Sequence, residues 1–243
     1  MPAEMPGRER RVPGQQGSDR PILRIQEDLW AEALGLAGVV ESALVQSVTA
    51  LCQHRPELAA GVKAIEREID RREVAIEREC LRVLALYEPV ASDFRRMLTV
   101  LRVNRDLERI GDLAARIAKH VRKLPAGPAV LPVPEALEAL AEAALESLRT
   151  TLDALARTDA QLGRTVIAGD RQLDRYRSAA RSELKASIKR DPERVEDWLR
   201  LLDIGRHLER IGDHASRIAE SVIYLKEGEI IRHSRGRPID PLP

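Results

Sequence analysis

Hydrophobic residues recur at intervals of three and four along most of the chain, a spacing that places them on one face of an α-helix. The clearest stripe is Val100, Val103, Leu107, Ile110, Ala114, Ile117, Val121 and Leu124. Prolines interrupt the pattern, because a proline in a helix interior removes a hydrogen bond and clashes with the preceding turn. Six segments lie between the prolines, at about 26–53, 56–86, 91–123, 134–157, 159–190 and 193–226. We predict one long helix in each segment.

The second half of the chain repeats the first. The sequence LERIGD at residues 107–112 recurs unchanged at residues 208–213, an offset of 101. Further upstream the offset becomes 104, as in the match of Leu58 with Leu162 and of Val62 with Val166. Long helices that are joined by short turns pack antiparallel. The repeat therefore predicts an all-α fold of two pseudo-symmetric antiparallel three-helix bundles in tandem.

Changes in composition along the chain place the domain boundaries. Residues 1–24 are rich in Pro, Gly and Arg, and we expect them to form a disordered tail. The first repeat is predicted at residues 25–124, a proline-rich linker at 125–133, the second repeat at 134–228 and a C-terminal tail at 229–243.

The composition supports the helical interpretation and excludes some partners. Aromatic residues make up 2% of the chain, whereas sheets use aromatic and β-branched residues heavily. The 40 basic and 39 acidic residues give a net charge of +1. This charge argues against nucleic-acid binding, which requires a basic surplus to displace counterions.

The sequence shows neither a membrane span nor a secretory signal, and this predicts the cellular compartment. No apolar stretch comes near the ~20 residues that span a membrane, and the N-terminus has no apolar segment of the kind found in secretory signals. Cys52 and Cys80 form no C-x-x-C pair and are interpreted as reduced thiols in the core. We therefore expect a cytoplasmic protein without a membrane span.

Acidic residues repeat on the helix faces that point away from the apolar stripes. At about 100° per residue, Glu108 and Asp112 lie on the side opposite to Leu107 and Ile110. The preceding predicted helix carries an acidic line of Glu66, Asp70, Glu73 and Glu77. In the second half the equivalent acids are Asp170, Asp174, Glu209 and Asp213. Each half thus has two [Glu/Asp]-x-x-x-Asp pairs on consecutive helices.

Like charges four residues apart destabilise a helix, so these faces need a cation, and two sources are open. Arg116 and Arg217, each four residues after an aspartate of the motif, could neutralise a solvated face. Alternatively, facing helices bring the carboxylates together around Mg, Mn, Ca or oxidised iron, which prefer oxygen ligands. Gly111 and Gly212 would then let a backbone or a ligand approach closely. Arg177 and Arg181 replace Glu73 and Glu77 in the second half, so we expect weaker metal binding there.

Three motifs together resemble one family. They are the repeated LERIGD, the sequence EPVASDFR at residues 88–95 and the sequence VIYLKEG at residues 222–228. In this order they resemble the PhoU family of phosphate transport system accessory proteins, with two PhoU domains over about residues 25–233.

The resemblance implies a function and a ligand set. It implies a dimeric cytoplasmic regulator without enzymatic activity, which restrains both the phosphate ABC importer, through its ATPase subunit, and the sensor histidine kinase of the phosphate regulon. It also implies metal ions, with iron, zinc, manganese and magnesium as candidates. The implied ligands are Glu66, Asp70, Glu108, Asp112, Asp170, Asp174, Glu209 and Asp213, with Glu73 and Glu77 as further candidates.

Two other functions remain open at this point. A carboxylate-bound metal site could hydrolyse phosphoesters, although the sequence offers no evident general base. A metal-free helical scaffold is the other alternative. His207 and His214 share a helix face and are interpreted as solvent-exposed or core histidines.

Overall fold

The computed structural model describes residues 21–87, 89, 91–125 and 130–231. Within these residues there are six α-helices, two short 3-10 helices and no strand. The elements are α1 (Pro21–Cys52), η1 (Pro56–Ala59), α2 (Val62–Tyr87), α3 (Ala91–Val121), α4 (Glu135–Arg157), α5 (Ala160–Arg190), η3 (Pro192–Arg194) and α6 (Val195–Glu227). The predicted all-α fold is confirmed.

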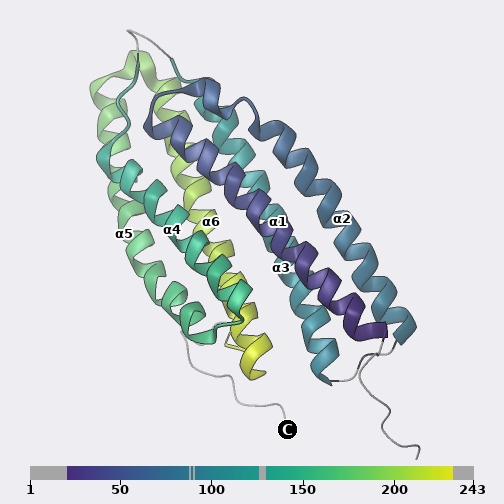
Figure 1. Ribbon diagram of the computed structural model, residues 1–243. Helices are drawn as coiled ribbons and strands as arrows, with labels where there is room; N and C mark the ends of the chain where they lie inside the picture. The colour runs from purple at the N-terminus through teal and green to yellow at the C-terminus, as the bar shows by residue number, and fades with distance from the viewer. Residues whose placement is uncertain (1–20, 88, 90, 126–129, 232–243) are drawn as a thin grey trace, which may run out of the picture.

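The six helices form two bundles that lie side by side (Figure 1). α1, α2 and α3 pack against one another, and α4, α5 and α6 form the second bundle. The bundles meet mainly along α3 and α6, and α1 also contacts α4. The predicted arrangement of two three-helix bundles in tandem is therefore confirmed.

The ends of the helices differ from the predicted segments by a few residues. α1 begins at Pro21, so residues 21–24, which we assigned to the tail, belong to the first helix. Proline is favoured in the first turn of a helix, where its missing N–H is not needed. Pro56 and Pro192 begin 3-10 helices that precede α2 and α6. Residues 1–20 and 232–243 of the two predicted tails lie outside the described residues.

The same polar contact joins the first and third helices of each bundle, which supports the repeat. Ser47 Oγ on α1 lies 3.0 Å from the carbonyl oxygen of Ala114 on α3. Thr151 Oγ1 on α4 lies 3.4 Å from the carbonyl oxygen of Ala215 on α6. These residues are related by the offsets of 104 and 101 that the sequence shows.

α1 corrects one expectation about membranes. Among the described residues its segment Ile22–Cys52 is long and apolar enough to cross a membrane, judged by length and composition alone. The sequence pattern predicts no such segment, because scattered charges interrupt the apolar residues of α1. Half of the apolar window is buried within the structure. Since α1 packs against α2, α3 and α4, three helical neighbours account for its apolar composition.

One buried polar contact crosses between the bundles. His214 Nδ1 on α6 lies 2.8 Å from Asp106 Oδ1 on α3, and His214 is almost fully buried. The core interpretation of His214 is therefore confirmed. A buried polar group that loses its partner destabilises a fold by about 1–3 kcal/mol, so this pair favours one way of joining the bundles.

Two glycines set the distance between the second and third helices of each bundle. A Cβ atom on Gly111 would lie 2.7 Å from Ile69 Cδ1, and a Cβ atom on Gly212 would lie 2.7 Å from Leu173 Cδ1. The space beside each glycine is thus filled by an apolar side chain of the neighbouring helix. The glycines allow the close approach that we predicted, but the group that approaches is a side chain of the core and not a backbone or a ligand.

We expect Gly111→Ala to destabilise the protein by about 1–3 kcal/mol, the usual effect of overpacking a core. The added methyl group must displace Ile69, which outweighs the gain of about 1 kcal/mol in helix propensity. Gly38→Ala on α1 is the matched control, because nothing lies within 4 Å of its added Cβ atom. Urea denaturation should show the opposite sign for the two variants. If both variants were stabilised equally, Ile69 would be able to move aside without loss of stability, which would contradict the prediction.

Candidate metal centre

The glycine contact brings two acidic helix faces together. Asp70 follows Ile69 on α2, and Asp112 follows Gly111 on α3. Asp70, Glu108 and Asp112 each place one carboxylate oxygen within 4.8 Å of the other two. Three of the four acids in the predicted pairs of the first bundle therefore converge where α2 meets α3. The apolar contact beneath them fixes their separation.

Two of the three carboxylates are less exposed than their position on the outer helix faces predicts, whereas Asp70 is exposed. The side chains of Glu108 and Asp112 are 21% and 24% exposed. Burial raises the pKa of Asp70, and the charges of Glu66 and Asp112 raise it further. Burial likewise raises the pKa of Glu108, with Asp112 as the strongest charge acting in the same direction. The cluster therefore carries repulsion that a cation would relieve.

Arginine and lysine side chains reach the cluster from its edges. Arg116 lies 3.8 Å from Asp112, as the neutralised-face alternative predicts. Arg109 lies 3.4 Å from Glu108 and 3.8 Å from Asp112, and Lys63 pairs with Glu66. Burial is the largest cause of the raised pKa of Asp70 and Glu108. Neighbouring carboxylates add to it, because Glu66 and Asp112 raise the pKa of Asp70 more than Lys63 lowers it, and Asp112 raises that of Glu108 more than Arg109 lowers it.

The other acids of α2 extend the line beyond the cluster. Glu66 and Glu73 are partly buried and Glu77 is exposed. Burial raises the pKa of Glu73, and the charges of Glu77 and Asp70 add to the effect. Within the described residues the group that meets the mutual distance of 4.8 Å contains none of these three. They surround the candidate site and do not form its centre.

Two residues near the cluster were not predicted. Arg109 is part of the LERIGD motif, one residue from Glu108 and three from Asp112, and this spacing could have identified it. Asn104 Nδ2 donates a hydrogen bond of 2.9 Å to the carbonyl oxygen of Glu73 and so ties α3 to α2. A polar residue on an otherwise apolar stripe was the available signal, because buried amides need partners.

The second bundle holds a partly neutralised version of the site. Arg177, at the position of Glu73, places Nε 2.8 Å from Glu209 Oε1. Burial raises the pKa of Asp170, Glu209 and Asp213, while Arg177 opposes the rise at Glu209 and Arg217 opposes it at Asp213. Among the described residues, Asp170, Asp174, Glu209 and Asp213 contribute no group of three ligand atoms within 4.8 Å.

Both halves match one family model. The PhoU domain matches residues 34–121 and again residues 137–222. The chain belongs to the PhoU family. The two matched ranges lie within the two predicted repeats, each over one bundle.

Named relatives and solved structures resemble this PhoU chain over most of its length. A protein of Pseudomonas putida named phosphate-specific transport system accessory protein PhoU homolog is 36% identical over 208 residues, which cover 85% of this chain and 81% of that protein. The phosphate-specific transport system accessory protein PhoU of Escherichia coli K12 is 29% identical over 216 residues, with 89% of each chain covered. The crystal structure of PhoU from Pseudomonas aeruginosa has a TM-score of 0.80 at 34% identity and covers 85% of this chain and 99% of its own. That of the phosphate transport system regulatory protein PhoU from Streptococcus pneumoniae has a TM-score of 0.77 at 30% identity, with coverages of 86% and 98%.

The raised pKa values predict an unusual pH dependence for the metal-free protein. Between its unfolded and its folded pKa, each of these carboxyl groups binds more protons when folded. The free energy of unfolding therefore falls as the pH rises through this window. Asp70→Asn removes one such group, so it should stabilise the chelator-treated protein at pH 7 by about 0.5 kcal/mol and flatten the pH dependence.

Urea denaturation from about pH 4, near the ordinary pKa of these carboxyl groups, up to pH 7 measures both effects. The control is Asp153→Asn on α4, the same chemical change at an exposed position far from the cluster. It should leave the slope against pH unchanged. If Asp70→Asn and Asp153→Asn gave the same slope, the cluster would not be under electrostatic strain.

Proposed function

We propose that this PhoU protein is a cytoplasmic, non-enzymatic regulator of phosphate uptake and of phosphate-starvation signalling. The observation that supports this most strongly is the match of the PhoU domain to both bundles. Relatives that share 29–36% of their residues with it are named accessory proteins of the phosphate-specific transport system. An accessory role requires surfaces that bind other proteins, and two bundles of long helices provide them.

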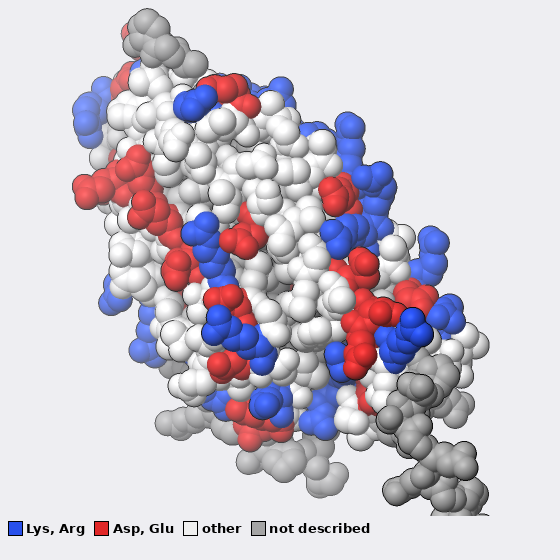
Figure 2. Space-filling model, viewed as in Figure 1, with Lys and Arg blue, Asp and Glu red and all other residues white. Residues whose placement is uncertain are grey.

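The proposed partners are the ATPase subunit of the phosphate ABC transporter and the sensor histidine kinase of the phosphate regulon, both negatively controlled, with the regulator acting as a homodimer. The face drawn in Figure 2 has a band of uncharged residues in the middle, with acidic and basic side chains on both sides of the band. Protein interfaces commonly combine a less charged centre with a polar rim. This surface is compatible with a protein partner.

We further propose that Asp70, Glu108 and Asp112 hold a metal ion between α2 and α3, with Glu66, Glu73 and Glu77 beside it. Three converging carboxylate oxygens suit cations such as Mg and Mn, and iron and zinc remain candidates. The bound ion would offset the repulsion that raises the pKa of Asp70 and Glu108, and it would link the two helices. The equivalent set in the second bundle, Asp170, Asp174, Glu209 and Asp213, should bind more weakly, because Arg177 already neutralises Glu209.

Paired variants in the two bundles test the metal proposal. Glu108→Gln/Asp112→Asn should remove most of the metal from chelator-stripped protein that is reloaded with Mn, Fe, Zn or Mg. Glu209→Gln/Asp213→Asn is the matched control at the repeated motif and should remove less. Elemental analysis gives the metal content, and the rise of Tm on adding metal gives an independent readout, because a ligand that binds the folded state stabilises it. Less than about 0.1 metal ion per wild-type chain would favour the metal-free scaffold.

Capture experiments test the proposed partners. The immobilised full-length protein should retain the purified ATPase subunit and the purified sensor kinase, with and without metal as separate arms. Glu108→Gln/Asp112→Asn then shows whether the metal supports either interaction. Retention of neither protein in any arm would contradict the regulatory role, and it would leave the family assignment unchanged.

A further inference from the structure

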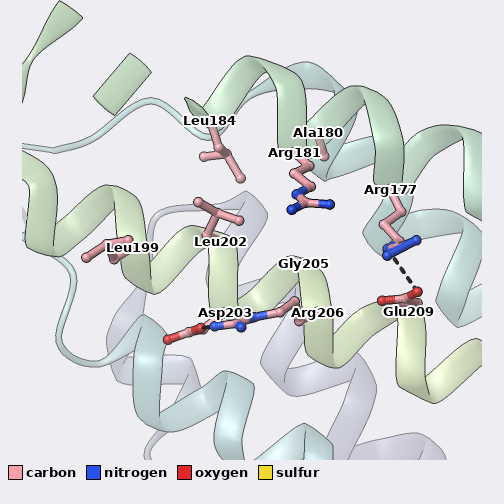
Figure 3. A pocket seen from close by; sticks show the side chains of 10 residues that line it. All are labelled: Arg177, Ala180, Arg181, Leu184, Leu199, Leu202, Asp203, Gly205, Arg206 and Glu209. Atoms are coloured by element: carbon pink, nitrogen blue, oxygen red, sulfur yellow. Dashed lines mark hydrogen bonds and ion pairs between the residues drawn. The ribbon is translucent and has the colours of Figure 1, made fainter. Parts of the chain in front are cut away.

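A cavity of about 600 Å³ lies between α5 and α6 in the second bundle. Figure 3 shows Leu184, Leu199 and Leu202 gathered at one end, and Arg177 with its partner Glu209 at the other. Arg181 points from α5 into the space between them. Pockets that hold small ligands have volumes of about 300–1,000 Å³ and combine apolar walls with a few polar groups. This cavity has both properties.

The first bundle shows which side chains are missing here. At the positions equivalent to Ala180 and Gly205 it has Ile76 and Asn104, which are 3% and 1% exposed. Asn104 bridges to the backbone of α2, and Ile76 belongs to the core. The space between the second and third helices is thus filled by side chains in the first bundle and open in the second.

Steric crowding does not explain why residue 205 is a glycine. The Cβ atom of an alanine at position 205 would lie 3.5 Å from Leu137 Cδ1, an ordinary contact, whereas at Gly111 and Gly212 it would clash. A glycine in a helix interior is about 1 kcal/mol less favourable than alanine. The contacts around position 205 therefore do not require a glycine, and Gly205 lines the open space.

The charge of the cavity is also reversed relative to the first bundle. Arg177 and Arg181 replace Glu73 and Glu77. Arg177 pairs with Glu209, and Arg206 pairs with Asp203. Arg181 has no ion pair among the described residues. Three arginines and two carboxylates line the cavity, so one positive charge is in excess. It lies on Arg181, which is exposed to solvent and points into the space between the two helices.

We propose that this cavity binds an organic anion that carries one carboxylate or phosphate group on an apolar body. The guanidinium group of Arg181 pairs with the anionic group, because its planar fork matches such oxygens in a bidentate geometry. The apolar body rests on Leu184, Leu199 and Leu202. A bare inorganic anion would leave these leucines in contact with water. An organic anion uses both ends of the cavity.

The probe for the test is 8-anilinonaphthalene-1-sulfonate, a monoanion with an aromatic body whose fluorescence rises in apolar sites. Titration of the full-length protein should show one saturable site. Arg181→Glu should weaken binding at least about tenfold, which corresponds to about 1.4 kcal/mol. Ala180→Ile, which restores the first-bundle residue and leaves the charge unchanged, should weaken it by occlusion. Arg171→Glu is the control, because the same charge change lies about 15 Å along α5 and should leave the affinity unchanged.

Two further readouts separate the outcomes. Thermal unfolding confirms that each variant is folded at the titration temperature. Competition distinguishes the ligand classes, since 4-phenylbutyrate should displace the probe at concentrations where inorganic phosphate does not. Equal affinity of the wild type, Arg181→Glu and Ala180→Ile would overturn the proposal. Displacement by phosphate as efficient as by 4-phenylbutyrate would overturn the role of the apolar wall.

Discussion

The contact between an apolar side chain and a glycine on the next helix is the constraint on which the acidic sites depend. In the first bundle Ile69 fills the space beside Gly111, and in the second Leu173 fills the space beside Gly212. Because each residue directly precedes an aspartate, the distance that the core sets for the helices also sets the distance between the carboxylates. Tight packing transmits such distances with little tolerance, since protein interiors are packed as densely as organic crystals. The polar site is therefore positioned from beneath by apolar atoms.

The two bundles share this contact, but their surface charges and their groove side chains differ. The first bundle keeps like charges together and fills the adjacent groove with Ile76 and Asn104. The second replaces two of the acids by arginines and leaves the groove open at Ala180 and Gly205. Surface charges and groove side chains can change independently of the helix spacing, because they lie above the contact that fixes it. The repeated three-helix bundle thus carries an acidic surface in the first half and an open groove lined by arginines in the second.

The sequence predicted the features that depend on periodicity, and it missed those that depend on which side chains meet. The repeat of LERIGD and the spacing of apolar residues determine the helices and their grouping, since both follow from residue order alone. The acidic faces were predicted for the same reason. That Asp70, Glu108 and Asp112 meet while Glu77 stays outside depends on how two helices rotate against each other. The contact of His214 with Asp106, and the cavity beside Arg181, arise between segments that no local pattern connects.

Arg177 belongs to both features of the second bundle and links them. Its Nε pairs with Glu209, a candidate metal ligand, and its side chain lines the cavity. Glu209 can bind a metal ion through that oxygen only if it gives up this pair, because one carboxylate oxygen cannot serve both cations at full strength. The released guanidinium group would then add a second unpaired positive charge to the cavity wall. Metal at the acidic face and an anion in the cavity would therefore favour each other through one side chain, and by linkage the coupling free energy must be the same in both directions.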